Sequence, residues 1–125
     1  GKAARRLLPK CLSVCMENDI DPDTIILTGH SLGGAVALIV GALMVRDEIV
    51  PEQIVTFGAP RCGRLKLLDG IPVTCYRHGK DIVPLIPPLM RRHKPLEQKG
   101  IKVSFIRDHY VHNYIEMDKV QEVNN

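Results

Sequence analysis

The stretch Ile25–Ala35 reads IILTGHSLGGA, and this stretch decides the fold. Its first residues, Ile25–Leu27, form a short β-branched and apolar run, which predicts a buried strand. The run Ala35–Val45 carries no charged residue and is rich in Ala, Leu and Val, which predicts a buried helix. A Gly-x-Ser-x-Gly motif centred on Ser31 therefore stands where a strand turns into a helix.

Such a turn must bend sharply, and the residue at the bend takes a strained backbone. Glycines two positions before and after Ser31 leave room for the strand and the helix to approach each other. The bend lifts the Ser31 hydroxyl clear of the sheet, and the helix N-terminus directs its N–H groups toward whatever binds there. We interpret the motif as the nucleophile elbow of an α/β-hydrolase. A serine-capped glycine turn is the alternative, whereas a phosphate-binding loop is disfavoured because no Lys-Ser/Thr pair follows the glycines.

The composition is ordinary for one compact globular domain spanning residues 1–125. Apolar residues make up 45% and charged residues 25% of the 125 residues. A net charge of +3 and an aromatic content of 4% argue against a nucleic-acid partner. The longest uncharged apolar run is shorter than the roughly 20 residues that a membrane span needs.

The four cysteines show no zinc-ligand spacing; they are Cys11, Cys15, Cys62 and Cys75. Small buried thiols are favoured for them, and a disulfide framework is the alternative. Cys11 and Cys15 fall on the apolar face of an amphipathic helix that runs to about Glu17. The chain also shows no signal peptide. We therefore expect reduced thiols and a cytoplasmic protein.

Strands alternate with helices or long loops along the rest of the chain. Further strands are predicted at Gln53–Phe57, Val73–Arg77 and Ile101–Ile106, and a C-terminal helix at Asp108–Val120. Prolines predict an irregular segment over Val83–Gly100. This order predicts an α/β fold with a mostly parallel sheet of about four strands and flanking helices.

A serine hydroxyl is a poor nucleophile at neutral pH, so it needs a base and an acid that holds the base in the right tautomer. In an α/β-hydrolase these residues follow in the order Ser, Asp or Glu, then His. Ser31, Asp81 and a histidine at 109 or 112 satisfy that order, each just after a predicted strand. The carboxyl ends of parallel strands share one edge of the sheet, so we expect these side chains to meet there.

Three motifs carry a resemblance to the class 3 lipases, in that family's order. They are GHSLGGA at Gly29–Ala35, TFGAP at Thr56–Pro60, and DIVP at Asp81–Pro84 with Pro87 and Pro88 beyond. The resemblance extends from the first helix to about Ile115. It implies an α/β-hydrolase fold, hydrolysis of carboxylic esters such as acylglycerols, Ser31 as the nucleophile and Asp81 as the acid. It also implies that Thr56–Pro60 shapes the floor of the site.

The resemblance leaves two histidines for the base. In the family the catalytic histidine follows the last strand, often with a tyrosine five residues on, and His109 has Tyr114 at that spacing. His112 instead matches a Tyr-x-His version through Tyr110. We favour His109, because a base must sit in the loop before the helix winds away. A surface histidine at a helix start is the alternative for either, and His30 is expected to pack beside the nucleophile.

One departure from the family concerns the oxyanion hole. The family domain begins with several strands that precede the first helix seen here, and one of their loops supplies a donor. This chain offers the Leu32 backbone N–H, and losing one such donor typically costs about 10²–10³ in rate. The first strand is also left with an open edge. We therefore expect a truncated or split domain, completed by a missing N-terminal segment or by a homo-oligomer.

Two segments suggest contact with lipid. The apolar loop Leu85–Met90 is expected either to line an acyl pocket, to touch a membrane surface peripherally, or to pack on the domain. The basic run Arg91–Lys94 is expected either to attract anionic headgroups or to be a solvated loop.

The function predicted from these features is that of a serine ester hydrolase. Its substrates would be lipid esters or small carboxylic esters, its mechanism would pass through an acyl-enzyme, and it would need no metal or organic cofactor. The missing first half favours an alternative, a catalytically weak or inactive hydrolase-like interaction module. Acyl transfer or thioester hydrolysis on the same triad is a second alternative.

Overall fold

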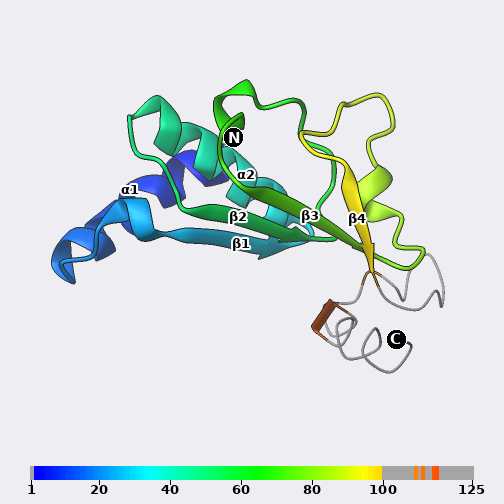
Figure 1. The fold of residues 1–125 in the computed structure, drawn as a ribbon, viewed down its shortest axis with the longest axis horizontal. Helices are drawn as coiled ribbons and strands as arrows, with labels where there is room; N and C mark the ends of the chain where they lie inside the picture. The colour runs from blue at the N-terminus through cyan, green and yellow to red at the C-terminus, as the bar shows by residue number, and fades with distance from the viewer. Residues whose placement is uncertain (1, 100–108, 110, 112–113, 116–125) are drawn as a thin grey trace.

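The computed structural model of this chain describes residues 2–99, 109, 111, 114 and 115. Its centre is a parallel sheet of four strands in the order β1-β2-β3-β4 (Figure 1). The strands are β1 (Ile26–His30), β2 (Gln53–Phe57), β3 (Val73–His78) and β4 (Leu96–Lys99). The helices are α1 (Lys2–Glu17) and α2 (Leu32–Arg46), with short 3₁₀ helices η1 (Pro22–Thr24), η2 (Lys66–Leu68) and η3 (Val83–Leu85). The predicted sheet of about four parallel strands with flanking helices is confirmed.

Helix α2 packs directly on one face of the sheet. A Cβ on Gly41 would lie 2.5 Å from Ile54 Cδ1, so the missing side chain at this position lets the helix approach β2 closely. Apolar residues of α2, β2 and the segment around η2 form the core beneath the helix: Ala37, Leu38, Ala42, Ile54, Leu68 and Ile71. This core fixes the helix that begins at the predicted elbow.

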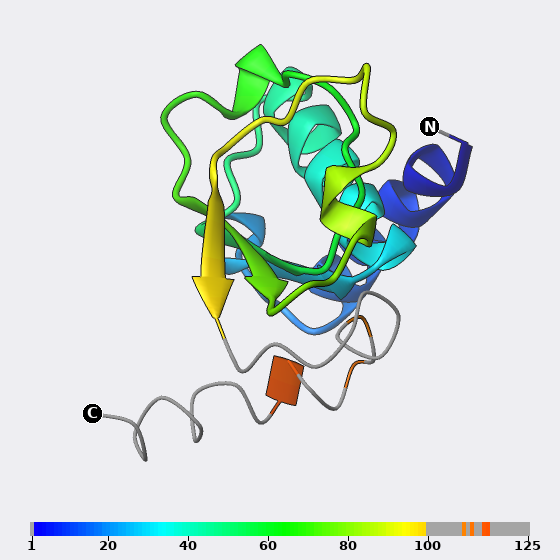
Figure 2. The same cartoon turned by 90° about the vertical axis from the view of Figure 1, so that its right-hand side faces the viewer.

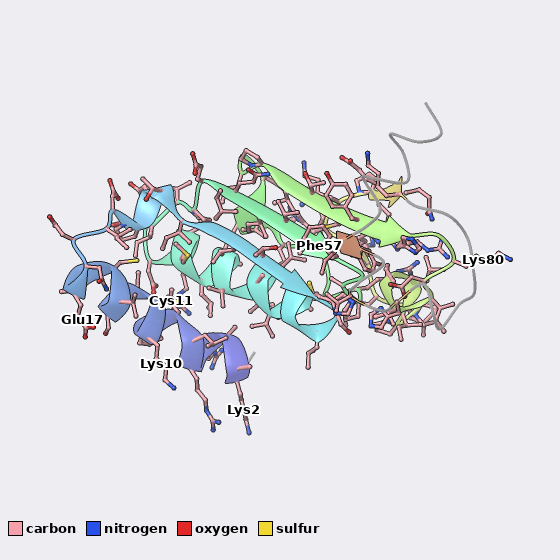
Figure 3. The ribbon with its side chains drawn as sticks, turned by 90° about the horizontal axis from the view of Figure 1, so that it is seen from below. Lys2, Lys10, Cys11, Glu17, Phe57 and Lys80 are labelled. Atoms are coloured by element: carbon pink, nitrogen blue, oxygen red, sulfur yellow. The ribbon has the colours of Figure 1, made fainter. Side chains whose placement is uncertain are left out.

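Helix α1 packs on α2, and Leu27 of β1 packs against the cluster that the two helices form. Ala4 and Leu8 contribute to a second buried cluster with Val40 and Met44 of α2. The opposite side of α1 is charged, and Lys2 and Lys10 point away from the domain (Figure 3). The predicted amphipathic helix ending near Glu17 is confirmed.

The strand ends place the candidate site at one edge of the sheet. The pairing of β1 with β2 brings His30 opposite Phe57, and the next pairing brings Phe57 opposite Tyr76. The chain therefore leaves β1, β2 and β3 at the same edge, where Ser31, Gly58 and Asp81 follow. Strand β1 lies at one edge of the described sheet and β4 at the other, and β1 was expected to have an open edge.

The prediction that Val83–Gly100 is irregular throughout was wrong, because β4 lies within it. Leu96 pairs with Cys75 and Lys99 with His78, although the sequence Leu-Glu-Gln-Lys has no β-branched residue. Pairing with β3 decides the conformation here, and local propensity does not. The strand predicted at Ile101–Ile106 lies outside the described residues, as does most of the predicted C-terminal helix.

The connection from β3 to β4 crosses the sheet on the same side as α2 (Figure 2). We call residues 82–95 the crossover. Backbone hydrogen bonds tie it to the loop after β2: Arg61 N donates to Ile86 O, and Gly63 N donates to Arg91 O. The crossover begins one residue after Asp81, so these bonds also anchor the segment that carries that side chain.

Among the residues that the structure describes, no helix is both long and apolar enough to cross a membrane. All four cysteines are free thiols, and Cys15 and Cys75 are buried. The elbow elements are slightly longer than expected, since the strand extends to His30 and the helix begins at Leu32.

Candidate active site

Ser31 occupies the sharp bend between β1 and α2. Its backbone has φ 56° and ψ −128°, in a region that residues with a side chain rarely adopt. Ser31 N donates to Phe57 O at 2.9 Å, and Gly34 N donates to Ser31 O at 3.0 Å. These bonds hold the strained residue between β2 and the first turn of α2, as the nucleophile-elbow interpretation requires.

The glycines around Ser31 allow this bend. A Cβ on Gly29 would lie 2.3 Å from the carbonyl oxygen of Gly33, and a Cβ on Gly34 would lie 2.7 Å from Ala59 Cβ. Strand and helix thus approach each other more closely than any larger residue permits. The sequence argument about room for the bend is correct for Gly29, whereas Gly33 has open space around its own Cβ position.

Three side chains from distant parts of the chain meet beside this bend. His109 Nε2 lies 2.9 Å from Ser31 Oγ, and His109 Nδ1 lies 2.8 Å from Asp81 Oδ2. Asp81 is fully buried, while the side chain of His109 is 22% exposed. The imidazole is therefore partly open to solvent, whereas the carboxylate is shielded from it.

The hydrogen bonds fix how the imidazole is protonated. An ionised carboxylate only accepts hydrogen bonds, so Nδ1 of His109 carries the ring proton and donates a hydrogen bond to Asp81 Oδ2. In the neutral ring Nε2 is then the acceptor, and the Ser31 hydroxyl donates to it. This arrangement suits a base that takes a proton from serine.

Asp81 is held by more than the imidazole. Its Oδ1 accepts from Val83 N at 2.9 Å, and its Oδ2 also accepts from the hydroxyl of Tyr114. Arg77 Nε donates to the backbone carbonyl of Asp81 at 2.7 Å. A buried carboxylate with this set of donors is fixed in place and needs no water to solvate it.

Tyr114 is buried against the same carboxylate. Burial and the hydrogen bond to Asp81 raise the pKa of Tyr114 far above its ordinary value. The phenol therefore stays protonated and donates throughout the physiological pH range.

Replacing Tyr114 by phenylalanine tests this contact. A hydrogen bond to a charged group is worth about 1.5–3 kcal/mol, so we expect Tyr114→Phe to lower the free energy of unfolding by about that amount. Urea unfolding at pH 7 measures the loss. An unchanged midpoint would mean that the hydroxyl does not support the carboxylate.

His30 does more than the packing expected for it. Its Nε2 lies 2.7 Å from the backbone carbonyl oxygen of His109, and because a carbonyl only accepts, Nε2 is the donor. The two imidazole rings lie 4.7 Å apart, and Tyr114 packs edge-on against His30 at 5.5 Å. His30 thus holds the backbone of His109, whose imidazole contacts Ser31.

Gly58 lets the backbone after β2 approach the side chains of Asp81 and Tyr114 closely. Its φ is +62°, and a Cβ there would lie 2.7 Å from both Asp81 Oδ2 and the Tyr114 hydroxyl oxygen. The expected contribution of Thr56–Pro60 to the floor corresponds to this close approach. Beside it, Phe57, Val111, Tyr114 and Ile115 line an apolar hollow of about 210 Å³; Phe57 is labelled in Figure 3.

The structure thus brings together Ser31, Asp81 and His109, which were predicted as the catalytic residues. Leu32, whose N–H was predicted for the oxyanion hole, directly follows Ser31 as the first residue of α2. The other histidine considered, His112, lies outside the described residues. The bond from Val83 N to Asp81 and the bond from His30 to His109 were not foreseen, because no sequence signal marks either.

Comparison with protein families gives one match over most of the chain. The model of the family described as Lipase (class 3) matches residues 2–91. This match includes the elbow, the segment after β2 and Asp81.

Comparison with individual proteins gives the same kind of relative. A secreted mono- and diacylglycerol lipase 1 of Fusarium solani is 39% identical over 70 residues, which cover 52% of this chain and 21% of that protein. A lipase of Rhizopus niveus is 41% identical over 73 residues, which cover 51% of this chain and 19% of that protein. The chain therefore spans about a fifth of the length of these curated relatives.

A solved structure shows the corresponding fold. The Lip2 lipase of Yarrowia lipolytica superposes with a TM-score of 0.60 at 28% identity, over 75% of this chain and 38% of that chain. The likeness therefore covers most of this chain and less than half of the Yarrowia lipase chain.

Proposed function

The chain belongs to the class 3 lipase family, and we propose on this basis that it hydrolyses carboxylic esters of lipids through a serine acyl-enzyme. The observation that carries the proposal is the hydrogen-bonded series from Asp81 through His109 to Ser31. The mono- and diacylglycerol lipase among its relatives favours acylglycerols or similar lipid esters as the substrates.

In the proposed acylation step, Ser31 Oγ attacks the ester carbonyl carbon while His109 Nε2 takes the hydroxyl proton. Asp81 keeps the imidazole in the correct tautomer and stabilises the imidazolium ion that forms. The carbonyl oxygen becomes an oxyanion next to the first turn of α2, where the Leu32 N–H donates to it. When the tetrahedral intermediate collapses, the bond to the alcohol breaks and His109 returns the proton to that alcohol.

The deacylation step repeats this chemistry with water. His109 takes a proton from a water molecule, whose oxygen attacks the acyl carbon on Ser31. The ester bond to Ser31 then breaks, and His109 returns the proton to the serine oxygen. The products are a carboxylic acid and the free enzyme.

We assign the acyl chain to the apolar hollow beside Tyr114. The hollow is lined by Phe57, Val111, Tyr114 and Ile115, and Tyr114 contacts the carboxylate of the proposed triad. A hydrocarbon chain placed there is removed from water within reach of the reacting centre.

Reaction with a fluorophosphonate tests the proposed function. The reagent phosphonylates a serine only where a base activates it, so we expect stoichiometric labelling of the folded protein. Peptide mapping by mass spectrometry should locate the label on Ser31 and on no other serine. A heat-denatured sample is the control, and a folded protein without label would favour the alternative, a hydrolase-like interaction module.

We further propose that the crossover contacts the surface of an anionic membrane. Leu89 is 99% exposed at its tip, and Ile86 and Met90 beside it are also exposed. The exposed cations Arg91 and Lys94 follow directly. An apolar tip flanked by cations suits an interface where acyl chains lie beneath anionic headgroups.

Replacing Leu89 by aspartate tests this contact. We expect Leu89→Asp to weaken binding to phosphatidylglycerol vesicles about tenfold. The variant loses an apolar contact and gains a negative charge, which the anionic headgroups repel. Sedimentation with vesicles measures the binding. Met16→Asp is the matched control, since Met16 is 81% exposed on α1, and equal binding by the two variants would contradict the proposal.

A further inference from the structure

We propose that a single monovalent anion of halide size binds between the crossover and the loop that follows β2. A small cavity of about 10 Å³ lies there, which is room for about one water-sized particle. Three basic side chains line it: Arg61, Arg92 and His93. The lining also includes two thiols and apolar side chains, and the described residues that line it include no Asp or Glu.

Two hydrogen-bond donors in these lining residues are buried without a partner among the described residues. One is Nε of Arg61, which always carries a proton. The other is Nε2 of His93, a side chain that is only 7% exposed. Buried donors of this kind are usually satisfied by an acceptor.

The protonation of His93 follows from its other nitrogen. Arg64 Nη1 lies 3.0 Å from His93 Nδ1, and because a guanidinium only donates, Nδ1 must be the acceptor. The ring is then neutral and its proton sits on Nε2. Burial and the charge of Arg64 also lower the pKa of His93, which favours the same neutral form. Nε2 is therefore a donor in need of an acceptor.

The charges around the cavity favour an anion over a water molecule. Arg61 Nη1 donates to Pro88 O at 2.8 Å and to Met90 O at 3.4 Å, and Arg92 Nη2 donates to Pro84 O at 2.8 Å. All three acceptors are neutral carbonyls. Burial and the nearby charge of Arg61 lower the pKa of Arg92. A water molecule could accept from the two donors. An anion would accept from them and also place a negative charge between two half-buried guanidinium groups.

The thiols in the lining do not supply this negative charge. Burial raises the pKa of Cys62 and of Cys75, so both stay neutral at physiological pH. A volume of about 10 Å³ limits the occupant to one small monatomic ion, whereas phosphate or a carboxylate is too large for it. The bound ion would join the loop after β2 to the crossover, which begins next to Asp81.

Two measurements with bromide test the site. Crystals of the protein soaked in sodium bromide should show an anomalous scattering peak in the cavity. In solution, thermal unfolding at pH 8 is compared in 0.1 M sodium bromide and 0.1 M sodium gluconate, so that ionic strength is constant. The bromide effect is the unfolding midpoint in bromide minus the midpoint in gluconate. We expect this effect to be roughly 2–5 °C larger for the wild type than for an Arg92→Gln variant.

Arg91→Gln is the matched control, because Arg91 is an exposed neighbour outside the lining of this cavity. It should keep the full bromide effect, whereas Arg92→Gln should lose it. The proposal is overturned if the cavity shows no anomalous peak. It is equally overturned if a peak appears in crystals but the bromide effect in solution is the same for wild type and Arg92→Gln.

Discussion

Replacing Ser31 by alanine is expected to lower kcat for ester hydrolysis by about 10⁴–10⁶. The variant keeps Asp81 and His109 but has no oxygen at 2.9 Å from the imidazole to form the acyl-enzyme. The substitution removes the nucleophilic oxygen, which acts in the transition state and not in substrate binding, so KM should change little. Initial rates with a series of p-nitrophenyl esters measure both constants.

Ser13→Ala is the matched control, because Ser13 is an exposed serine on α1 and should leave the rate unchanged. A Ser31→Ala/His109→Ala double variant should be no slower than Ser31→Ala alone, since residues of a catalytic unit are not additive. Wild-type rates in Ser31→Ala would show that the activity belongs to another group.

The sheet edge at which the site lies could be predicted from the sequence. Each of β1, β2 and β3 is a β-branched or apolar run followed by a residue of distinctive chemistry, and parallel strands bring such residues together. The order of Ser31, Asp81 and His109 then follows from the strand order. Local patterns were sufficient for Ser31 and Asp81, because each of them follows within three residues of the end of a strand.

The contacts between these strand ends could not be predicted in the same way. Strand β4 forms from Leu96–Lys99 because β3 offers it an edge, and nothing in its own residues indicates a strand. The bond from His30 to the carbonyl of His109 joins residues 79 positions apart through a backbone atom, which carries no sequence signal. The unpartnered donors of Arg61 and His93 likewise arise only where the crossover folds over the loop after β2.

The second large effect is expected at Gly29, where alanine should destabilise the protein by at least about 3 kcal/mol. Its Cβ would lie 2.3 Å from Gly33 O, 2.4 Å from Gly33 C and 2.6 Å from Gly34 N. All three are backbone atoms, so no side chain can rotate away. The backbone of the bend cannot easily retreat either, because Ser31 N is bonded to Phe57 O.

Gly33→Ala is the matched control for the same chemical change four residues on. No atom lies within 4 Å of a Cβ at Gly33, and alanine favours the helix, so this variant should be neutral or more stable by up to about 1 kcal/mol. Urea unfolding of both variants measures the contrast. Equal stabilities would mean that the strand and the helix can separate at the elbow. The strained backbone of Ser31 would then not be held by their close packing, and another contact would have to keep the serine beside His109.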